Sequence, residues 1–224
     1  MKIKFIIGLI CLLPFFGFAQ GEFNQWRFGF NAGLDLNFSP PMSVPGSGLT
    51  SFFPTISVSD SLGNLLFYSN GASVWNKNNV AMQNGGGLYG NSSRQTVYSI
   101  KDIGTSNEYF IFTIGPWNFF PSMKGLFYSK VDMNLAGGLG GIIPGMKNIP
   151  IPGGENTPSG IHGTRHSNNK DAWLVVRTQS PQVFLSYLVT SAGLNSTPVI
   201  SQSSINNPMG PSVPGFVVIK ISQD

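Results

Sequence analysis

Two histidines, His162 and His166, lie four residues apart in the stretch "HGTRH". On a helix that spacing would place both rings on one face, where they could hold zinc. Gly163 and the following "SNNKD" instead favour a strand that enters a turn, and the ends of such a strand lie about 13 Å apart. The nearest carboxylates are Glu155 and Asp171. We therefore expect a histidine that hydrogen-bonds the turn, and neither a metal site nor a cofactor.

Acidic residues offer the other possible chemistry. Asp102, Glu108 and Asp132 would supply the carboxyl pair of a glycoside hydrolase if adjacent strands brought them together. Acids of this kind are more common in solvent-exposed turns, and the chain has no G-x-S-x-G nucleophile motif. We therefore expect no enzymatic activity. The alternative is a propeller enzyme acting on polysaccharide, in which Asp102, Asp132 and His166 line a central channel.

An aromatic loop is the strongest binding candidate in the sequence. In "TIGPWNFFPSMKG" (113–125), Trp117, Phe119 and Phe120 stand between two prolines. If they are exposed, they form a rigid apolar patch suited to stacking on a sugar or contacting a protein. The alternative is that the three rings cover the core between two sheets.

The first residues have the features of a secretory signal. Two lysines give a positive start, residues 5–16 are apolar, and small residues precede a cleavage site after Ala19. The apolar run is too short to span a bilayer comfortably. The sequence therefore predicts a signal peptide over 1–19, a mature domain over 20–224 and no transmembrane segment in the mature chain. A retained N-terminal anchor is the alternative.

Composition limits the kinds of chemistry and the kinds of partner that the mature chain can have. The single cysteine, Cys11, lies within the signal, so the mature domain has neither disulfides nor thiol chemistry. Of 13 basic residues, Lys2 and Lys4 leave with the signal, and the remaining 11 against 9 acidic residues give a net charge of +2. These 11 are scattered, which argues against a nucleic-acid partner. The glycines of "GGGLYG" (85–90) precede a strand pattern and not a helix, so they predict a loop and no phosphate site.

Strand-and-turn patterning dominates the chain. Charged residues make up only 10%, and glycine and proline supply 28 and 16 of the 224 residues, so no helical stripe is free of turn formers. A unit of one strand, a polar turn and a denser apolar strand recurs along the sequence, and two copies are followed by further strands. The units are 55–71, 96–115, 163–179 and the incomplete 216–224, with the added strands at 125–140 and 184–199.

Four strands in roughly 40 residues is the repeat of a β-propeller blade. The sequence therefore predicts an all-β fold, namely a partial propeller with about three and a half WD40- or YVTN-like four-stranded blades. A β-sandwich is the alternative. Because the last unit stops at Asp224 after its first strand, we expect the domain to be truncated at its C-terminal end. Alternatively, residues 24–36 pair with that strand and close a small ring.

The stretches "WRFGFNAGLDLNF", "GNLLFYSNGASVWN" and "GLFYSKVDMNLAGGLG" occur in the mature chain, and the second is the most specific. Together they resemble the N-terminal propeller region of gliding-motility-associated surface proteins, which gram-negative bacteria export by the type IX secretion system. The resemblance implies a WD40- or YVTN-like propeller, an extracellular or outer-membrane location and no established catalytic residues. It also implies O-glycosylation of Ser61 in the triplet "DSL". This sequence lacks the sorting domain in which those proteins typically end.

These features predict a secreted or cell-surface module that binds or scaffolds and is not an enzyme. Its loops would present a site to a surface glycan or a protein, in a role linked to adhesion or gliding. The polysaccharide-acting enzyme is one alternative. A structural spacer within a larger surface protein is another.

Overall fold

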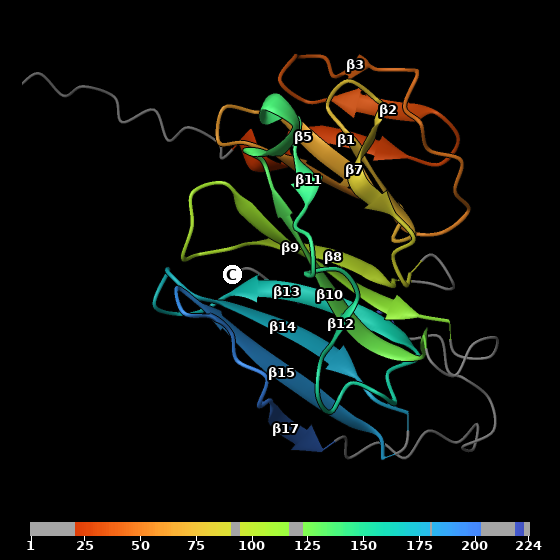
Figure 1. Ribbon diagram of the computed structural model, residues 1–224. Coiled ribbons are helices and arrows are strands. Elements are labelled where there is room, and N and C mark those ends of the chain that lie inside the picture. Colours follow the sequence, from red (N-terminus) through yellow and green to blue (C-terminus); the bar gives the residue numbers. More distant parts are fainter. Residues whose placement is uncertain (1–20, 91–94, 117–122, 180, 203–217, 222–224) are drawn as a thin grey trace, which may run out of the picture.

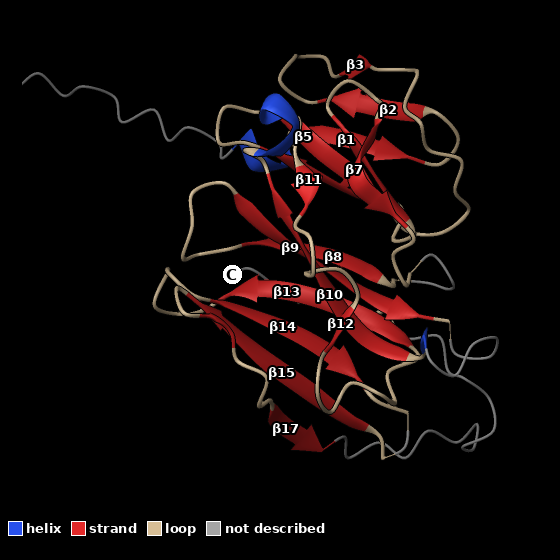
Figure 2. Cartoon of the chain, in the orientation of Figure 1, coloured by secondary structure: helices blue, strands red, loops and turns tan. Residues whose placement is uncertain are grey.

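The computed structural model describes residues 21–90, 95–116, 123–179, 181–202 and 218–221. Regular structure in these residues is almost entirely β-strand, with two short 3-10 turns (Figure 1, Figure 2). The prediction of an all-β fold is therefore confirmed. The predicted signal peptide and its cleavage site at Ala19 lie outside the described residues.

The first sheet is small and antiparallel. It follows the 3-10 turn η1 (Gly21–Phe23), and its first hairpin turns through Gly29 and Asn31, both of which have positive φ. Glycine and asparagine are the residues that tolerate this conformation best. The strands are β1 (Gln25–Phe28), β2 (Ala32–Asp35) and β3 (Met42–Ser43).

The second group of strands is an antiparallel meander that begins with the predicted hairpin at 55–71. Asp60 holds its turn, because one carboxylate oxygen accepts hydrogen bonds from the backbone N–H groups of Leu62 and Asn64, each at 2.9 Å. Gly63 in the same turn has φ +85°. The strands are β4 (Ile56–Ser59), β5 (Leu65–Ser69), β6 (Ser73–Asn76) and β7 (Ala81–Gly86).

The third group contains a hairpin of two eight-residue strands and the glycine- and proline-rich segment 137–160. That segment supplies two short strands, and both pair with β10. The elements are β8 (Val97–Lys101), β9 (Glu108–Gly115), β10 (Gly125–Asp132), the 3-10 turn η3 (Leu135–Gly138), β11 (Gly141–Ile142) and β12 (Ile149–Pro150).

The second and third groups form one nine-stranded sheet. A single parallel pairing, between Gln83 of β7 and Gly141 of β11, joins them. Eight of its strands follow the order β4-β5-β6-β7-β11-β10-β9-β8, and the ninth, β12, pairs with β10 beside this path. The two end strands β4 and β8 contact each other, so the sheet is barrel-like and nearly closed. Its interior is an apolar core of Phe67, Val74, Met82, Leu88, Val97, Tyr109, Ile111, Val131 and Ile142.

The last sheet lies at the opposite end of the molecule from the first (Figure 1). Beside it, the backbone of Ile219 exchanges two hydrogen bonds of 2.6 Å with the side chain of Gln95, which precedes β8. The strands are β13 (Ser159–Arg165), β14 (Ala172–Arg177), β15 (Val183–Thr190), β16 (Gly193–Leu194) and β17 (Val199–Gln202), with β16 and β17 both paired to β15.

Strand β9 is buried on both of its faces. Phe110, Phe112 and Ile114 belong to the core shared with the last sheet. Tyr109 and Ile111 belong to the core inside the nine-stranded sheet. The described chain therefore has more than the two layers of a simple sandwich.

The first strands of successive groups lie next to one another: β1 contacts β4, β4 contacts β8 and β8 contacts β13. Side chains make the hydrogen bonds between them. Ser57 Oγ accepts from the Arg27 backbone N–H at 2.7 Å, and Thr55 Oγ1 donates to the Arg27 carbonyl at 2.9 Å. Further along, the Tyr98 hydroxyl donates to the Gly163 carbonyl at 3.1 Å.

Candidate binding surface

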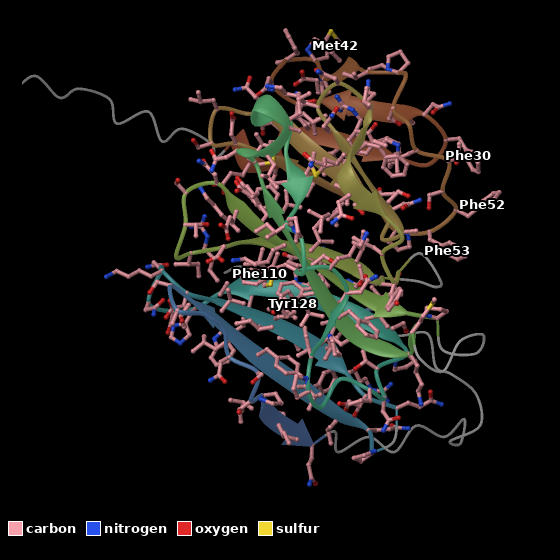
Figure 3. All side chains as sticks on the ribbon, in the orientation of Figure 1. Phe30, Met42, Phe52, Phe53, Phe110 and Tyr128 are labelled. Atoms are coloured by element: carbon pink, nitrogen blue, oxygen red, sulfur yellow. The ribbon has the colours of Figure 1, made fainter. Side chains whose placement is uncertain are left out.

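Exposed aromatic side chains gather in the N-terminal part of the described chain. Every exposed phenylalanine or tryptophan among the described residues falls between positions 23 and 53. Figure 3 shows three of them, Phe30, Phe52 and Phe53, projecting from the edge of the molecule. Phe30 and Phe52 are in contact, with their ring centres 4.7 Å apart, and exposed apolar patches mark interaction sites on soluble proteins.

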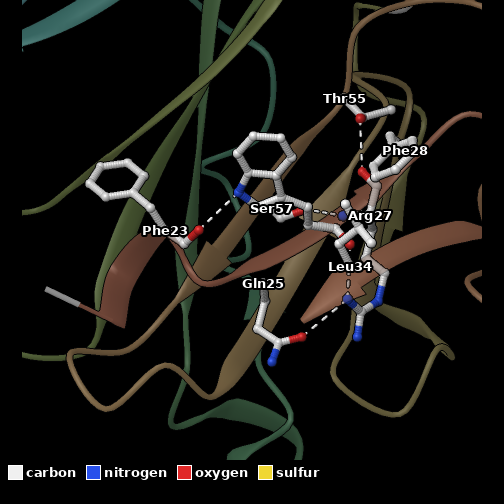
Figure 4. A pocket seen from close by; sticks show the side chains of 8 residues that line it. Phe23, Gln25, Arg27, Phe28, Leu34, Thr55 and Ser57 are labelled. Atoms are coloured by element: carbon white, nitrogen blue, oxygen red, sulfur yellow. Dashed lines mark hydrogen bonds between the residues drawn. The ribbon is translucent and has the colours of Figure 1, made fainter. Parts of the chain in front are cut away.

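We define the aromatic end face as Phe23, Trp26, Phe28 and Leu34, with Phe30, Phe52 and Phe53 as its rim. Leu34 lies directly opposite Trp26 in the β1–β2 register, so both side chains share one side of the sheet. A hollow of about 490 Å³ opens here (Figure 4). It is lined by the four face residues, by Gln25 and Arg27 of β1, by Ser57 of β4 and by Thr55 just before β4. The surface is thus both apolar and concave, as binding sites usually are.

Trp26 is held by its edge, and its ring face remains accessible. The indole N–H donates to the Phe23 carbonyl at 2.8 Å, and the side chain is 50% exposed. Its only polar group is therefore satisfied within the chain. What Trp26 offers a ligand is apolar ring surface.

The other side of β1 is polar and buried, which reverses the usual alternation of a sheet that has one face in water. Gln25 and Arg27 are each 7% exposed. Arg27 Nη1 donates to the Gln25 side-chain oxygen at 3.1 Å and to the Trp26 carbonyl at 3.0 Å. Because Arg27 and Gln25 fill the inner side, Trp26 and Phe28 are directed outward.

The ionisable groups on the inner side of the β1–β2 hairpin, Arg27 and Asp35, remain charged. Burial lowers the pKa of Arg27, and the nearby Tyr68 and Asp35 oppose that shift, so the guanidinium remains protonated. Burial by itself would raise the pKa of Asp35. Hydrogen bonds from the backbone of Asn37 and the side chain of Gln25 outweigh that effect, and the pKa is lower than usual.

A second apolar sheet face lies on the last sheet. In the β14–β15 register Trp173 is opposite Leu188 and Val175 is opposite Ser186, and in the β15–β17 register Val199 is opposite Ser186. These side chains therefore share one side, together with Phe184. The other side packs into the core through Leu174, Val176, Leu185, Tyr187 and Val189. We define the far end face as Trp173, Val175, Phe184, Leu188 and Val199.

A larger hollow, of about 1170 Å³, lies between η1, β8 and the β13–β14 turn, and both polar and apolar side chains line it. Asp102 and His166 line it, and Asp132 does not. His166 Nδ1 accepts a hydrogen bond from the Asn168 backbone N–H at 3.1 Å, and its ring stacks on Trp173. The prediction that this histidine hydrogen-bonds the turn is confirmed.

His162 lies on β13 with its ring beside that of Tyr98, and burial lowers its pKa. Within the described residues no three His, Cys, Asp or Glu side chains lie close enough to hold a metal ion.

The acids of the alternative enzyme have partners in the fold. Lys130 of β10 forms ion pairs with Asp102, at 2.7 Å, and with Glu108, at 2.5 Å. Asp132 accepts a hydrogen bond from the Asn134 backbone N–H at 2.8 Å and so holds the turn after β10. These contacts stabilise turns and neighbouring strands.

The sequence-predicted binding residues Trp117, Phe119 and Phe120 lie outside the described residues. Ser61, the residue expected to be O-glycosylated, lies exposed in the β4–β5 turn. The sequence analysis did not single out Trp26. The signal was present in "QWRF" as an alternation of polar and aromatic residues, but alternation does not reveal which side faces the solvent.

Comparison of the chain with models of protein families, with curated proteins and with solved structures finds no match. In the part of the chain that the structure describes, no helix has the length and apolar character needed to cross a membrane.

Proposed function

We propose that this protein is an exported, non-enzymatic module that binds a protein partner through its aromatic end face. The observation that carries the proposal is the confinement of all described exposed phenylalanines and tryptophans to residues 23–53. Aromatic anchors are enriched at protein–protein interfaces.

The chemistry of the face favours a protein over a glycan. A sugar needs several polar groups around the ring that stacks on it. Gln25 and Arg27 also line the hollow, but each is only 7% exposed and Arg27 donates a hydrogen bond to Gln25. The indole N–H of Trp26 is likewise already bonded. An extended surface of exposed rings, including Phe30 and Phe52, which meet edge to face at 4.7 Å between ring centres, matches an apolar protein surface better.

We infer further that the four groups of strands, β1–β3, β4–β7, β8–β12 and β13–β17, are successive blades of a partial propeller. Two features support this: each group is a meander that follows the previous one in sequence, and the first strands β1, β4, β8 and β13 contact one another in that order. First strands of propeller blades surround a common axis in this way. Burial of β9 on both faces agrees with a strand between two blades.

Export is part of the same proposal. It is supported by the charged and apolar pattern of residues 1–19 and by the resemblance to type IX-exported surface proteins. A role in adhesion or gliding would place the aromatic end face where it meets another surface protein.

Photo-cross-linking in the exporting cell tests the proposal. A benzoylphenylalanine is introduced at Phe28, which is 40% exposed on the face, or at Leu62, which is 81% exposed in the β4–β5 turn. We expect a discrete cross-linked protein from position 28 and none from position 62, identified by mass spectrometry. Equal products at both positions, or none at 28, would contradict the proposal.

Trp26→Ala is the variant that should lose the cross-linked product. It should abolish the product at position 28, because the largest ring of the face is removed, while the melting temperature changes little at this half-exposed site. Phe52→Ala, which removes a rim ring that is 89% exposed, should leave more of the product.

A further inference from the structure

We propose a second binding site, for a polysaccharide that carries carboxylate groups, in the larger hollow between η1, β8 and the β13–β14 turn. This inference goes beyond the proposed function, because the ligand is different and the two hollows share only Phe23. The hollow measures about 1170 Å³, which exceeds the roughly 300–1,000 Å³ of pockets that enclose a small molecule. It therefore has room for several linked sugar units.

Strands β8 and β13, which both border the hollow, run in the same direction. The Gly160 backbone N–H donates to the Gln95 carbonyl at 3.2 Å. Three residues further along both segments, the Tyr98 hydroxyl donates to the Gly163 carbonyl at 3.1 Å. The carboxyl ends of the two strands and the turns that follow them therefore lie on the same side of the molecule (Figure 1).

Three exposed cations line the hollow at this end. Lys101 is the last residue of β8, Arg165 is the last residue of β13, and Lys170 lies in the β13–β14 turn. Within the part of the chain that the structure describes, Lys101 and Lys170 form no ion pair. Their ammonium groups can therefore bind an anion that enters the hollow.

The carboxylates of the lining do not cancel these charges. Asp102 is paired with Lys130, which lies outside the lining, at 2.7 Å. Asp171 accepts a hydrogen bond from the Asn168 side chain at 2.7 Å. Apart from Asp102, the carboxylates are Glu22 and Asp171, two against the three cations. The balance favours an anionic ligand, and the two carboxylates can accept hydrogen bonds from sugar hydroxyl groups.

The same hollow has the mixture of groups that a sugar ring needs. The ring of Phe23, which is 69% exposed, offers an apolar surface to the C–H side of a sugar. Ser167 and Asn169 add exposed hydroxyl and amide groups. His166 accepts the Asn168 N–H at Nδ1, so its neutral ring carries a donor proton on Nε2. An acidic peptide would use the cations but has no hydroxyl groups for these partners, so a glycan fits better.

Isothermal titration calorimetry of the purified full chain with oligogalacturonate tests the inference. We expect binding, and a loss of at least about tenfold in affinity for the methyl-esterified oligomer, because esterification removes the charges and leaves the sugar rings. Lys101→Met and Lys170→Met should each weaken the binding of oligogalacturonate by about tenfold. Lys77→Met removes an exposed cation of the β6–β7 turn, outside the hollow, and is the matched control.

Four results would overturn the inference. They are no binding of oligogalacturonate, equal affinity for its methyl ester, an equal loss in Lys77→Met, and equal affinity for polyglutamate of the same charge. The last result would identify a site for acidic peptides. Because the substituted lysines are exposed, the variants should keep the melting temperature of the wild type.

The proposed function is tested separately. Lys101→Met should leave the cross-linked product at position 28 unchanged, and Phe52→Ala should leave the affinity for oligogalacturonate unchanged. A cross-linked product without oligogalacturonate binding removes only the second site. Oligogalacturonate binding without a cross-linked product removes only the protein-binding face.

Discussion

Strands β1 and β9 are both rich in aromatic residues, but these side chains are exposed on β1 and buried on β9. β9 carries Phe110 and Phe112, which are 3% and 0% exposed, whereas β1 carries Trp26 and Phe28, at 50% and 40%. In Figure 3, Phe110 lies between sheets while Phe30, which follows β1, projects outward. The difference arises from neighbours: β9 has a sheet on each face, and β1 has one only on its polar side. Aromatic content therefore contributes to stability in one region and remains available for binding in the other.

The largest expected effect is at the centre of the doubly covered strand. Phe112→Ala removes a ring from the core between β9 and the last sheet and should lower the free energy of unfolding by about 3–5 kcal/mol. Phe52→Ala, at 89% exposure, should change it by less than about 0.5 kcal/mol. Chemical denaturation of both variants measures the contrast. Similar losses would mean that the rim rings are packed as tightly as the core.

The sequence predicted one of these regions better than the other. The denser apolar strand of the unit 96–115 contains "YFIFTIG", and such an almost continuous apolar run is typical of a strand buried on both faces. In β1 the alternation of "QWRF" is typical of a strand with two unlike sides, but no side was assigned from it. The alternation does not show which side faces inward, since that depends on where β1 lies against the chain about thirty residues away, where Ser57 and Thr55 bond the Arg27 backbone.

A second strong effect is expected where β13 approaches β8. A Cβ atom at Gly163 would lie 2.4 Å from Cε1 of Tyr98. Gly163→Val should therefore displace the Tyr98 ring, break its hydrogen bond to the Gly163 carbonyl and lower stability by about 2–3 kcal/mol. Thermal unfolding measures this change. Gly86→Val, at a glycine with no atom within 4 Å of the added Cβ, is the matched control and should be much milder.

The ion pairs of Lys130 provide a smaller effect that depends on pH. Lys130→Met leaves Asp102, whose side chain is 5% exposed, without its cation. The expected cost at neutral pH is about 1–2 kcal/mol, less than for a fully buried pair, because Lys130 is partly exposed and Asp102 keeps the hydrogen bond from the Gly104 backbone N–H. Burial by itself would lower the pKa of Lys130, but the hydrogen bonds that its ammonium donates to Asp102 and Glu108 outweigh that effect and raise the pKa above 10.5. The stabilisation is therefore complete below pH 10.5 and is lost as pH rises through the higher folded value. An equal alkaline loss of stability in wild type and variant would show that other groups cause it.

The smallest effect is expected at the β4–β5 turn, where a hydrogen-bonded and an exposed residue are adjacent. Asp60→Ala removes the acceptor for the Leu62 and Asn64 N–H groups and should cost about 1 kcal/mol, whereas Ser61→Ala should be nearly neutral. Burial would raise the pKa of Asp60, yet the hydrogen bonds from Asn64 and Leu62 outweigh it and lower the pKa below 3.8. The contribution is thus present above pH 3.8 and disappears as pH falls through the folded value.

Acid unfolding of the wild type, Asp60→Ala and Asp60→Asn measures this contribution. The asparagine can still accept the turn hydrogen bonds, so it should recover part of the stability without the pH dependence. If the asparagine variant matches the alanine variant, the charge and not the acceptor geometry holds the turn.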